Sequence, residues 1–290
     1  LFNTIPDSAK ATIETLDLSN VDDVADFEFK DFKSLETLDL NGVEGLTTEQ
    51  FEAISNKSFI KTLDLSYVDV ETFDFKEFAS LETLKLAMPM HRYIRGSVPP
   101  PPKDFSALFN SIPEPAKATI KTLDLSNMTI PAGFDFKDFK SLETLNLSDV
   151  EGLTTEQFES IPNKALIKTL DLSYVNDVIG FDFKGFDKLE TLIVHETKLS
   201  AAQYNELPDS PKSSMNYLNL SGIDVTGLNL LGFTSLEYLD LSNTTGSVED
   251  VFNSIPAKAK ASISTLNLKD VNVTSLDLSK FAKLKYLNLD

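Results

Sequence analysis

The chain has 290 residues with 45 acidic and 26 basic side chains, which gives a formal net charge of −19 at pH 7. A chain this acidic is repelled by the phosphates of nucleic acids and by anionic membrane surfaces, so neither is expected as a partner. The lack of cysteine excludes disulfides and thiolate metal sites, and no run of about 18 apolar residues that could span a membrane is present.

One short motif is written twelve times along the chain. Each copy reads L-x-x-L-x-L, as in Ile120–Leu125 (IKTLDL), and its last three positions alternate with the period of a strand. Because so short a segment cannot bury its leucines alone, the copies are expected to stack and share one continuous core. They start at Ile13, Leu35, Ile60, Leu81, Ile120, Leu142, Ile167, Leu189, Met215, Leu236, Ile263 and Leu284.

This tandem array resembles the leucine-rich repeat family, and the resemblance covers essentially the whole chain. It implies an α/β fold, a right-handed horseshoe-like solenoid with a parallel inner sheet of about twelve strands. Short helices and extended strands are then expected on the outer side. The steps between motifs are 22, 25, 21, 39, 22, 25, 22, 26, 21, 27 and 21 residues, so short and long repeats alternate apart from the 39-residue step.

The long repeats carry helix signals between one strand and the next. Thr47 with Gln50, Thr154 with Gln157 and Ser200 with Gln203 fit capping boxes. Proline follows soon after three of these segments, at positions 162, 208 and 256, and is expected to end the helices. We therefore expect short helices at about 47–55, 105–112, 154–161, 200–206 and 248–254.

The short repeats carry a second apolar-polar-apolar triplet midway between strands, which predicts a short strand or extended run on the outer face. These triplets are 27–29, 73–75, 134–136, 181–183, 228–230 and 276–278.

The turn after each strand departs from the family pattern. The usual asparagine or cysteine three places after the last leucine is replaced by residues such as Val21, Val43 and Met128. The backbone groups of this turn must therefore be satisfied in another way.

We expect a single domain over residues 1–290. Within it, residues 1–87 and 108–195 are duplicated blocks, 251–290 is a third, partial copy, and 88–102 is an insertion at the seam. The insertion holds Arg92, Tyr93 and Arg95, including both arginines of the chain, followed by a proline run. Two interpretations stand: a basic, aromatic loop that contacts a partner, or an insertion tolerated at a duplication seam.

On the inner sheet, the residue between the two leucines should face outward, and in most copies it is Asp or Asn. Since neighbouring strands lie about 4.8 Å apart, the aspartates would form a ladder of like charge. The ladder could bind a cation or a basic ligand, or it could be inherited from the ancestral repeat. Lys85 and Ile193 interrupt it, each at the end of a duplicated block.

Four larger side chains are expected to gather on the concave face. Ile193 and His195 should face outward from one strand, with Tyr217 and Tyr238 on the next two. Aromatic residues dominate the energetics of many interfaces, so these four side chains are candidates for partner contact. Neutral divergence of the repeats is the alternative.

The sequence offers little for catalysis. Of its two histidines only His195 could meet an acid and a serine on its strand neighbour, and Asp and Ser are so often repeated at these positions that their proximity carries little information. No phosphate-binding glycine loop and no metal-ligand spacing occurs, so no catalytic residue, metal or cofactor is expected.

We therefore expect a non-catalytic protein-binding or adhesion module, secreted or at a cell surface. The alternative is a structural scaffold that associates with itself. The last motif stops at Asp290 with Leu284, Leu287 and Leu289 uncovered, so we expect either that the protein continues or that another chain covers this coil.

Overall fold

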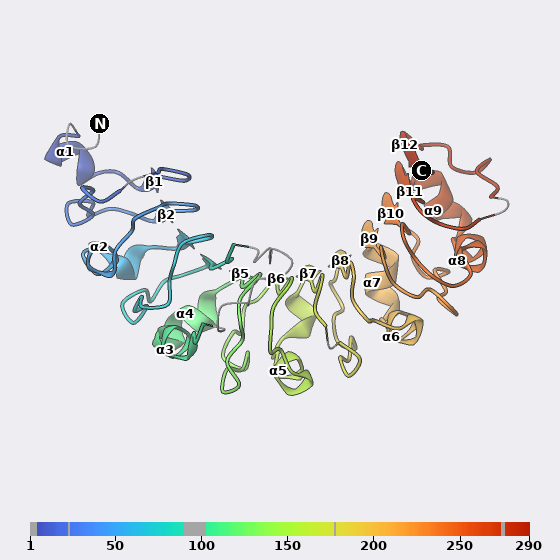
Figure 1. Ribbon diagram of the computed structural model, residues 1–290, viewed down its shortest axis with the longest axis horizontal. Coiled ribbons are helices and arrows are strands. Elements are labelled where there is room, and N and C mark those ends of the chain that lie inside the picture. Colours follow the sequence, from blue (N-terminus) through green and yellow to red (C-terminus); the bar gives the residue numbers. More distant parts are fainter. Residues whose placement is uncertain (1–4, 23, 90–102, 177, 274–275) are drawn as a thin grey trace, which may run out of the picture. The chain divides into compact units, whose positions relative to one another are not determined.

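The computed structural model describes residues 5–22, 24–89, 103–176, 178–273 and 276–290. Twelve strands of three residues form one parallel sheet in sequence order, which confirms the predicted solenoid (Figure 1). The strands are β1 Thr15–Asp17, β2 Thr37–Asp39, β3 Thr62–Asp64, β4 Thr83–Lys85, β5 Thr122–Asp124, β6 Thr144–Asn146, β7 Thr169–Asp171, β8 Thr191–Ile193, β9 Tyr217–Asn219, β10 Tyr238–Asp240, β11 Thr265–Asn267 and β12 Tyr286–Asn288.

The chain divides into two compact units, which we describe separately. Unit 1 comprises Leu1–Leu142 and Val150–Leu153, and unit 2 comprises Glu143–Asp149 and Thr154–Asp290. In each unit the central leucine of one strand is in register with that of the next, as Leu38 is with Leu63 and Leu218 with Leu239. These leucines are fully buried, so each unit has an unbroken leucine column beneath its strands.

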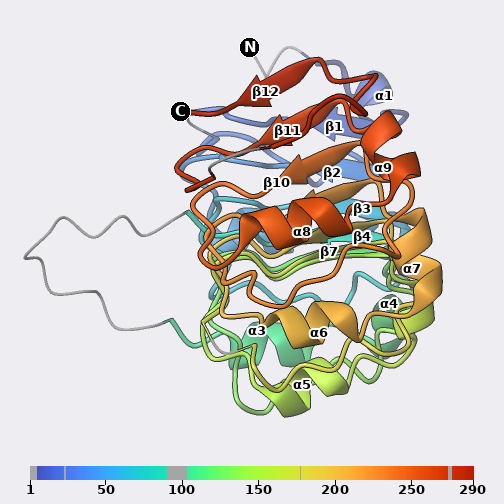
Figure 2. The same ribbon diagram turned by 90° about the vertical axis from the view of Figure 1, so that its right-hand side faces the viewer.

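Helices run along the far side of the long coils, where Figures 1 and 2 show them away from the strands. The capping boxes at Thr47, Thr154 and Ser200 are all present, and each begins a helix as predicted. The helices are α1 Asp7–Lys10, α2 Thr48–Glu52, α3 Ser106–Ser111, α4 Glu114–Thr119, α5 Thr155–Glu159, α6 Ala201–Asn205, α7 Asp209–Ser214, α8 Val248–Ser254 and α9 Ala257–Ser262, with 3-10 turns η2 Lys57–Phe59 and η3 Lys164–Leu166.

The prolines do more than end helices. Pro113, Pro208 and Pro256 are the N-cap residues of α4, α7 and α9, which the sequence analysis did not predict. Proline fits the start of a helix because it lacks the N–H group that would be unsatisfied there. Each of these prolines therefore separates two helices of one long coil.

The outer triplets of the short coils have the predicted alternation of burial. Phe73 and Phe75 are buried with Asp74 between them half-buried, yet no strand ladder forms among the described triplets. The reason is that long coils flank the short coils, so a triplet has helices rather than extended chain beside it. Side chains bond its backbone instead: Ser111 Oγ accepts a 2.9 Å hydrogen bond from the N–H of Phe75. These triplets are extended runs.

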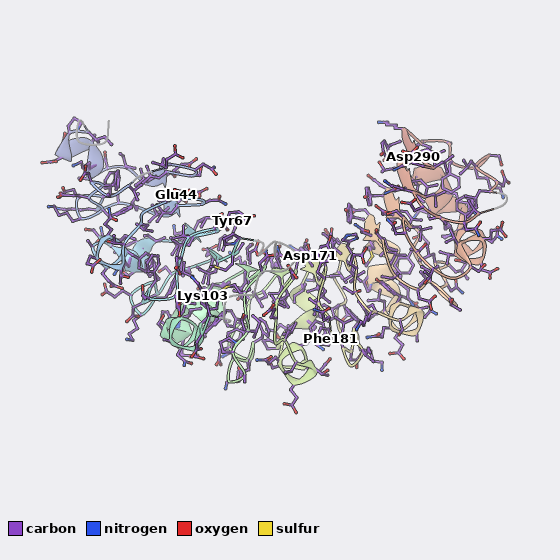
Figure 3. The ribbon with its side chains drawn as sticks, in the orientation of Figure 1. Glu44, Tyr67, Lys103, Asp171, Phe181 and Asp290 are labelled. Atoms are coloured by element: carbon purple, nitrogen blue, oxygen red, sulfur yellow. The ribbon has the colours of Figure 1, made fainter. Side chains whose placement is uncertain are left out.

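Phenylalanines fill the space between the helices and the outer triplets. The rings of Phe51 and Phe73 stack with centroids 4.2 Å apart in unit 1, and Phe158 and Phe181 stack at 4.1 Å in unit 2. Figure 3 places Phe181 on the side of its coil opposite Asp171 of the sheet. At these positions both units thus have a leucine layer beneath the strands and an aromatic layer between the helices and the outer triplets.

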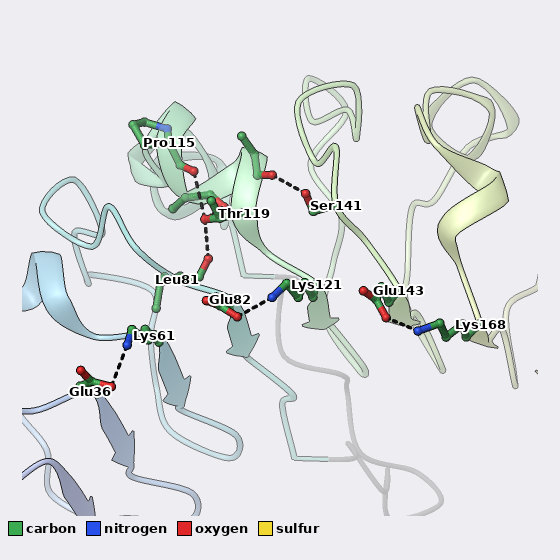
Figure 4. Close-up of polar contacts among 12 residues, drawn as sticks. Glu36, Lys61, Leu81, Glu82, Pro115, Thr119, Lys121, Ser141, Glu143 and Lys168 are labelled. Atoms are coloured by element: carbon green, nitrogen blue, oxygen red, sulfur yellow. Dashed lines mark hydrogen bonds and ion pairs between the residues drawn. The ribbon is translucent and has the colours of Figure 1, made fainter. Parts of the chain in front are cut away.

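Side-chain hydrogen bonds join successive coils in unit 1. Thr119 Oγ1 donates to the carbonyl of Leu81 at 2.7 Å, and Ser141 Oγ donates to the carbonyl of Ala118 at 2.7 Å (Figure 4). Carbonyls between helix and strand are satisfied in this way without a backbone ladder.

The turn after ten of the twelve strands is closed by the Asp or Asn between the two leucines. Asp124 Oδ1, for example, accepts a 2.9 Å hydrogen bond from the N–H of Ser126. The same bond, at 2.8–3.2 Å, is made by Asp17, Asp39, Asp64, Asn146, Asp171, Asn219, Asp240, Asn267 and Asn288. This Asx turn takes the place of the family's missing asparagine or cysteine.

One residue further along, the backbone takes a left-handed conformation. Asn20, Asn127 and Asn243 occupy this position with φ of 57°, 61° and 54°. Tyr67 and Tyr174 occupy it as well, with φ of 65° and 60°, although a tyrosine gains nothing from this conformation. The two tyrosines lie at matching positions of the duplicated blocks.

One expectation about burial needs correction. The residues between the leucines were expected to be exposed, but Asp64 and Asp240 are only 5% and 6% exposed because neighbouring side chains cover them. In the last motif, Leu287 is only partly buried and Leu289 is 59% exposed, as the sequence analysis expected for this coil.

Within the described residues, no helix is both long and apolar enough to cross a bilayer.

Candidate functional site

The four residues expected on the sheet face come from three consecutive strands of unit 2. Ile193 ends β8 and His195 follows it by two residues, while Tyr217 and Tyr238 begin β9 and β10. Tyr217 is in register with Tyr238, and Ile193 is in register with Asn219. All four side chains are partly exposed, and we name them the unit 2 patch.

The two tyrosines form a rigid pair. Their rings are nearly parallel, 9° apart, with centroids separated by 4.2 Å. The hydroxyl of Tyr238 donates to Asp240 Oδ2 at 3.2 Å. Burial, followed by the charge of Asp240, raises the pKa of Tyr238 well above its ordinary value, so this hydroxyl stays a donor at neutral pH.

Asp240 is the buried anchor beneath this pair. Its Oδ2 also accepts from Asn267 Nδ2 at 2.8 Å, and its Oδ1 accepts from the N–H of Ser242 at 2.8 Å and from the Ser242 hydroxyl at 2.6 Å. The same hydroxyl lies 3.0 Å from that of Ser221 on the preceding coil. A carboxylate with this many donors holds its neighbours in fixed positions, so the tyrosine pair has little freedom to move.

His195 contacts a residue that the sequence analysis did not select. Its ring packs edge-on against Tyr174, with centroids 4.9 Å apart and planes at 89°. Tyr174 is 41% exposed and is one of the two left-handed tyrosines. A signal was available: tyrosine stands where most other repeats hold Asn, Asp or Gly. We include Tyr174 in the candidate surface.

The Nδ1 atom of the His195 ring is buried and finds no hydrogen-bond partner among the described residues. An acid bonded to that nitrogen is what orients the histidine of a Ser-His-acid triad. The closeness of Asp171 and Ser173 on the preceding coil therefore does not create a triad at Nδ1.

Ile193 changes its own turn as well as the surface. An isoleucine has no acceptor atom, so the strand-end bond made by Asp171 on the preceding coil cannot form here. The turn still takes its left-handed residue at Glu196, with φ of 52°. At this coil an apolar surface residue therefore stands where Asp or Asn would make the turn bond.

The aspartate column gives no evidence for a cation site. Each Asp or Asn has a local role in its turn, and no group of three or more His, Asp or Glu suited to a metal occurs in the part of the chain that the structure describes. In unit 1 the column is interrupted by Lys85, whose Nζ lies 2.9 Å from Asp64 Oδ2. The turn bond explains why Asp and Asn recur, an explanation that neither sequence interpretation included.

The other predicted contact residues, Arg92, Tyr93 and Arg95, lie outside the described residues. Their role in partner contact stays a prediction.

No protein-family model and no curated protein sequence matches the chain. Solved structures do match. The functional domain of InlJ from Listeria monocytogenes, which includes a cysteine ladder, has a TM-score of 0.59 at 15% identity over 97% of this chain. The chain spans 54% of that structure and contains no cysteine, so it has no counterpart of the ladder.

Two further structures have similar scores. The internalin InlF of Listeria monocytogenes has a TM-score of 0.58 at 13% identity, covering 99% of this chain and 89% of that one. YopM, a leucine-rich effector protein from Yersinia pestis, has a TM-score of 0.52 at 15% identity, covering 88% of this chain and 60% of that one. The chain therefore has the fold of the leucine-rich repeat family.

Proposed function

We propose that the chain is a non-catalytic protein-recognition module, and that its partner contacts the sheet of unit 2 at the unit 2 patch and Tyr174. The single observation that carries this is the stacked pair of Tyr217 and Tyr238, in which Tyr238 is bonded to Asp240. A rigid, half-exposed aromatic pair can bind a partner with little loss of conformational entropy. Adhesion to a protein of another cell is the finer form of this proposal.

Comparison within the sheet supports the proposal. The strand position that holds these tyrosines is threonine in nine of the twelve strands, including the neighbours β8 and β11. The chain folds its other coils with threonine here, so the fold does not require a tyrosine at this position. The presence of two tyrosines here is therefore not explained by packing of the leucine core, and partner binding is the role we propose for them.

The matched test replaces both tyrosines with the residue of the neighbouring strands. Proteins captured from a cell-surface extract by the wild type are compared with those captured by Tyr217→Thr/Tyr238→Thr. Tyr286→Thr serves as the control because Tyr286 has the same position in β12 and is 54% exposed. Circular dichroism verifies that the variants remain folded.

We expect one captured protein, once purified, to bind the double variant at least tenfold more weakly than the wild type. The Tyr286→Thr control should keep wild-type affinity for it. Equal affinity of all three forms for every captured partner would contradict the proposed surface.

A further inference from the structure

A column of charged residues runs beside the sheet, one position before each strand. In unit 1 it alternates in sign from Glu36 onward, and Glu36 pairs with Lys61 at 2.8 Å and Glu82 with Lys121 at 2.7 Å. In unit 2 it begins in the same way, with Glu143 and Lys168 at 2.5 Å. Figure 4 shows all three pairs. Each glutamate in these pairs is neutralised by a lysine on the following coil.

The alternation breaks at the coils that carry the tyrosine pair. The residue after Glu190 in the column is Asn216, whose N–H donates to the Glu190 carbonyl at 3.2 Å. The residue after Glu237 is Ser264, whose N–H donates to the Glu237 carbonyl at 2.8 Å. Neither Asn216 nor Ser264 can neutralise a carboxylate.

Both glutamates are exposed, and neither forms an ion pair within the described residues. Lys168, on the coil before Glu190, donates from Nζ to Glu143 and not to Glu190. The column therefore keeps its acids and loses its bases over the coils of β8 to β11.

The unpaired carboxylates belong to the same coils as the aromatic rings or to the coil before them. Glu237 directly precedes Tyr238, and Asn216, which follows Glu190 in the column, directly precedes Tyr217. Both glutamates are exposed and both tyrosines are partly exposed. Carboxylates next to aromatic rings are the groups that recognise lysine and arginine, through ion pairs and through cation–π contact.

A second aromatic ring adjoins the unit 2 patch. Tyr174 follows β7 and packs against His195. Burial, then the negative charges of Glu196 and Asp149, raise the pKa of Tyr174, which is 41% exposed. The surroundings of this ring are therefore negatively charged as well.

We infer that the unit 2 patch takes a basic segment of a protein partner, with lysine or arginine side chains placed against Glu190 and Glu237. This rests on the proposed function and adds the chemistry of the partner. Glu190 and Glu237 belong to coils two strands apart, which corresponds to about 10 Å. Two basic residues spaced by about that distance would meet both carboxylates.

A peptide-display experiment tests the basic character of the partner separately from the location of the binding surface. A random peptide library is selected on the wild-type chain and then depleted on Tyr217→Thr/Tyr238→Thr. Peptides that survive depletion bind through the tyrosine pair, and we expect them to be enriched in lysine and arginine. Survivors without such enrichment would overturn the basic-partner inference while leaving the binding surface in place. A library with no survivors would overturn the proposed function, and the inference with it.

Two double variants with the same change in charge then test the role of Glu190 and Glu237. The affinity of each variant for the most enriched peptide is measured. Glu190→Gln/Glu237→Gln and Glu36→Gln/Glu82→Gln each remove two negative charges, but only the second pair is bonded to lysines in the wild type. We expect the first variant to weaken binding at least fivefold and the second less than twofold. Equal weakening would show nonspecific attraction to an acidic chain and overturn the inference, as would an unchanged affinity of the first variant.

Discussion

The Nζ atom of Lys85 lies 2.9 Å from Oδ2 of Asp64, its register partner on the neighbouring strand. The next residue in the column is Asp39, whose pKa is raised by burial and then by the charges of Asp64 and Asp17. The hydrogen bond to Asp64 in turn raises the pKa of Lys85. One cation therefore offsets the repulsion among three carboxylates of unit 1.

Replacing Lys85 with Met should lower the free energy of unfolding by about 1–2 kcal/mol at pH 7, since the pair is partly exposed. The loss should shrink as the pH falls toward 4. A carboxyl whose folded pKa is raised destabilises the fold when ionised, and protonation relieves it. Urea unfolding at pH 7 and pH 4.5 measures the difference.

Lys76→Met is the control, because Lys76 pairs with Asp74 outside the aspartate column. An equal loss for Lys85→Met at both pH values would contradict this electrostatic explanation. On the alkaline side, the contribution of Lys85 is lost as the pH rises through its raised folded pKa, which lies above both test values.

The strand-end bond predicts different outcomes for two substitutions of Asp124. Asp124→Asn keeps an acceptor for the N–H of Ser126 and should leave stability nearly unchanged, as Asn146 makes the same bond. Asp124→Ala removes the acceptor and should cost about 0.5–1.5 kcal/mol. Thermal or urea unfolding measures both. If the two variants lost equal stability, charge rather than the turn bond would be the cause.

Tyr204 places a hydroxyl in the aromatic layer of unit 2. The residue is 1% exposed, its hydroxyl has no hydrogen-bond partner among the described residues, and burial raises the pKa of the phenol well above its ordinary value. Tyr204→Phe should therefore raise the free energy of unfolding by about 1–2 kcal/mol. The reciprocal change Phe158→Tyr should lower it. A destabilised Tyr204→Phe protein would mean that the hydroxyl is bonded.

Tyr67 adopts a left-handed backbone conformation, which costs a tyrosine about 1 kcal/mol more than it costs asparagine or glycine. Tyr67→Asn should increase stability by about that amount, because Asn127 occupies the matching turn after β5. Asn127→Tyr should decrease it similarly. Urea unfolding of both variants checks the reciprocity, and no gain in Tyr67→Asn would show that packing of the ring outweighs the strain.

Local signals made much of the fold predictable. The leucine periodicity predicted every strand, and the capping boxes predicted where α2, α5 and α6 begin. The second helices α4, α7 and α9 were missed because proline was interpreted only as a stop. The described outer triplets form no strand ladder because helices of the neighbouring coils lie beside them. The sequence of a single repeat does not show which element lies beside it.

The candidate site was only partly predictable. Alternation placed Ile193, Tyr217 and Tyr238 on the exposed face, but their bonds depend on register between coils. The Asp240 network, the contact of Tyr174 with His195 and the unpaired Glu190 all require residues from neighbouring coils to be compared side by side. A search along one repeat at a time cannot detect them.

The side chains that bond the outer triplets tie each short coil to the long coil that follows it. Gln50 Nε2 donates to the carbonyls of Val24 at 2.5 Å and Phe27 at 3.1 Å, and Gln203 Nε2 donates to those of Val178 at 2.7 Å and Phe181 at 3.2 Å. Deleting one coil would leave such carbonyls without donors or place two helices side by side, whereas deleting two consecutive coils would restore the alternation. Viable changes in the length of this molecule should therefore come in whole pairs of coils.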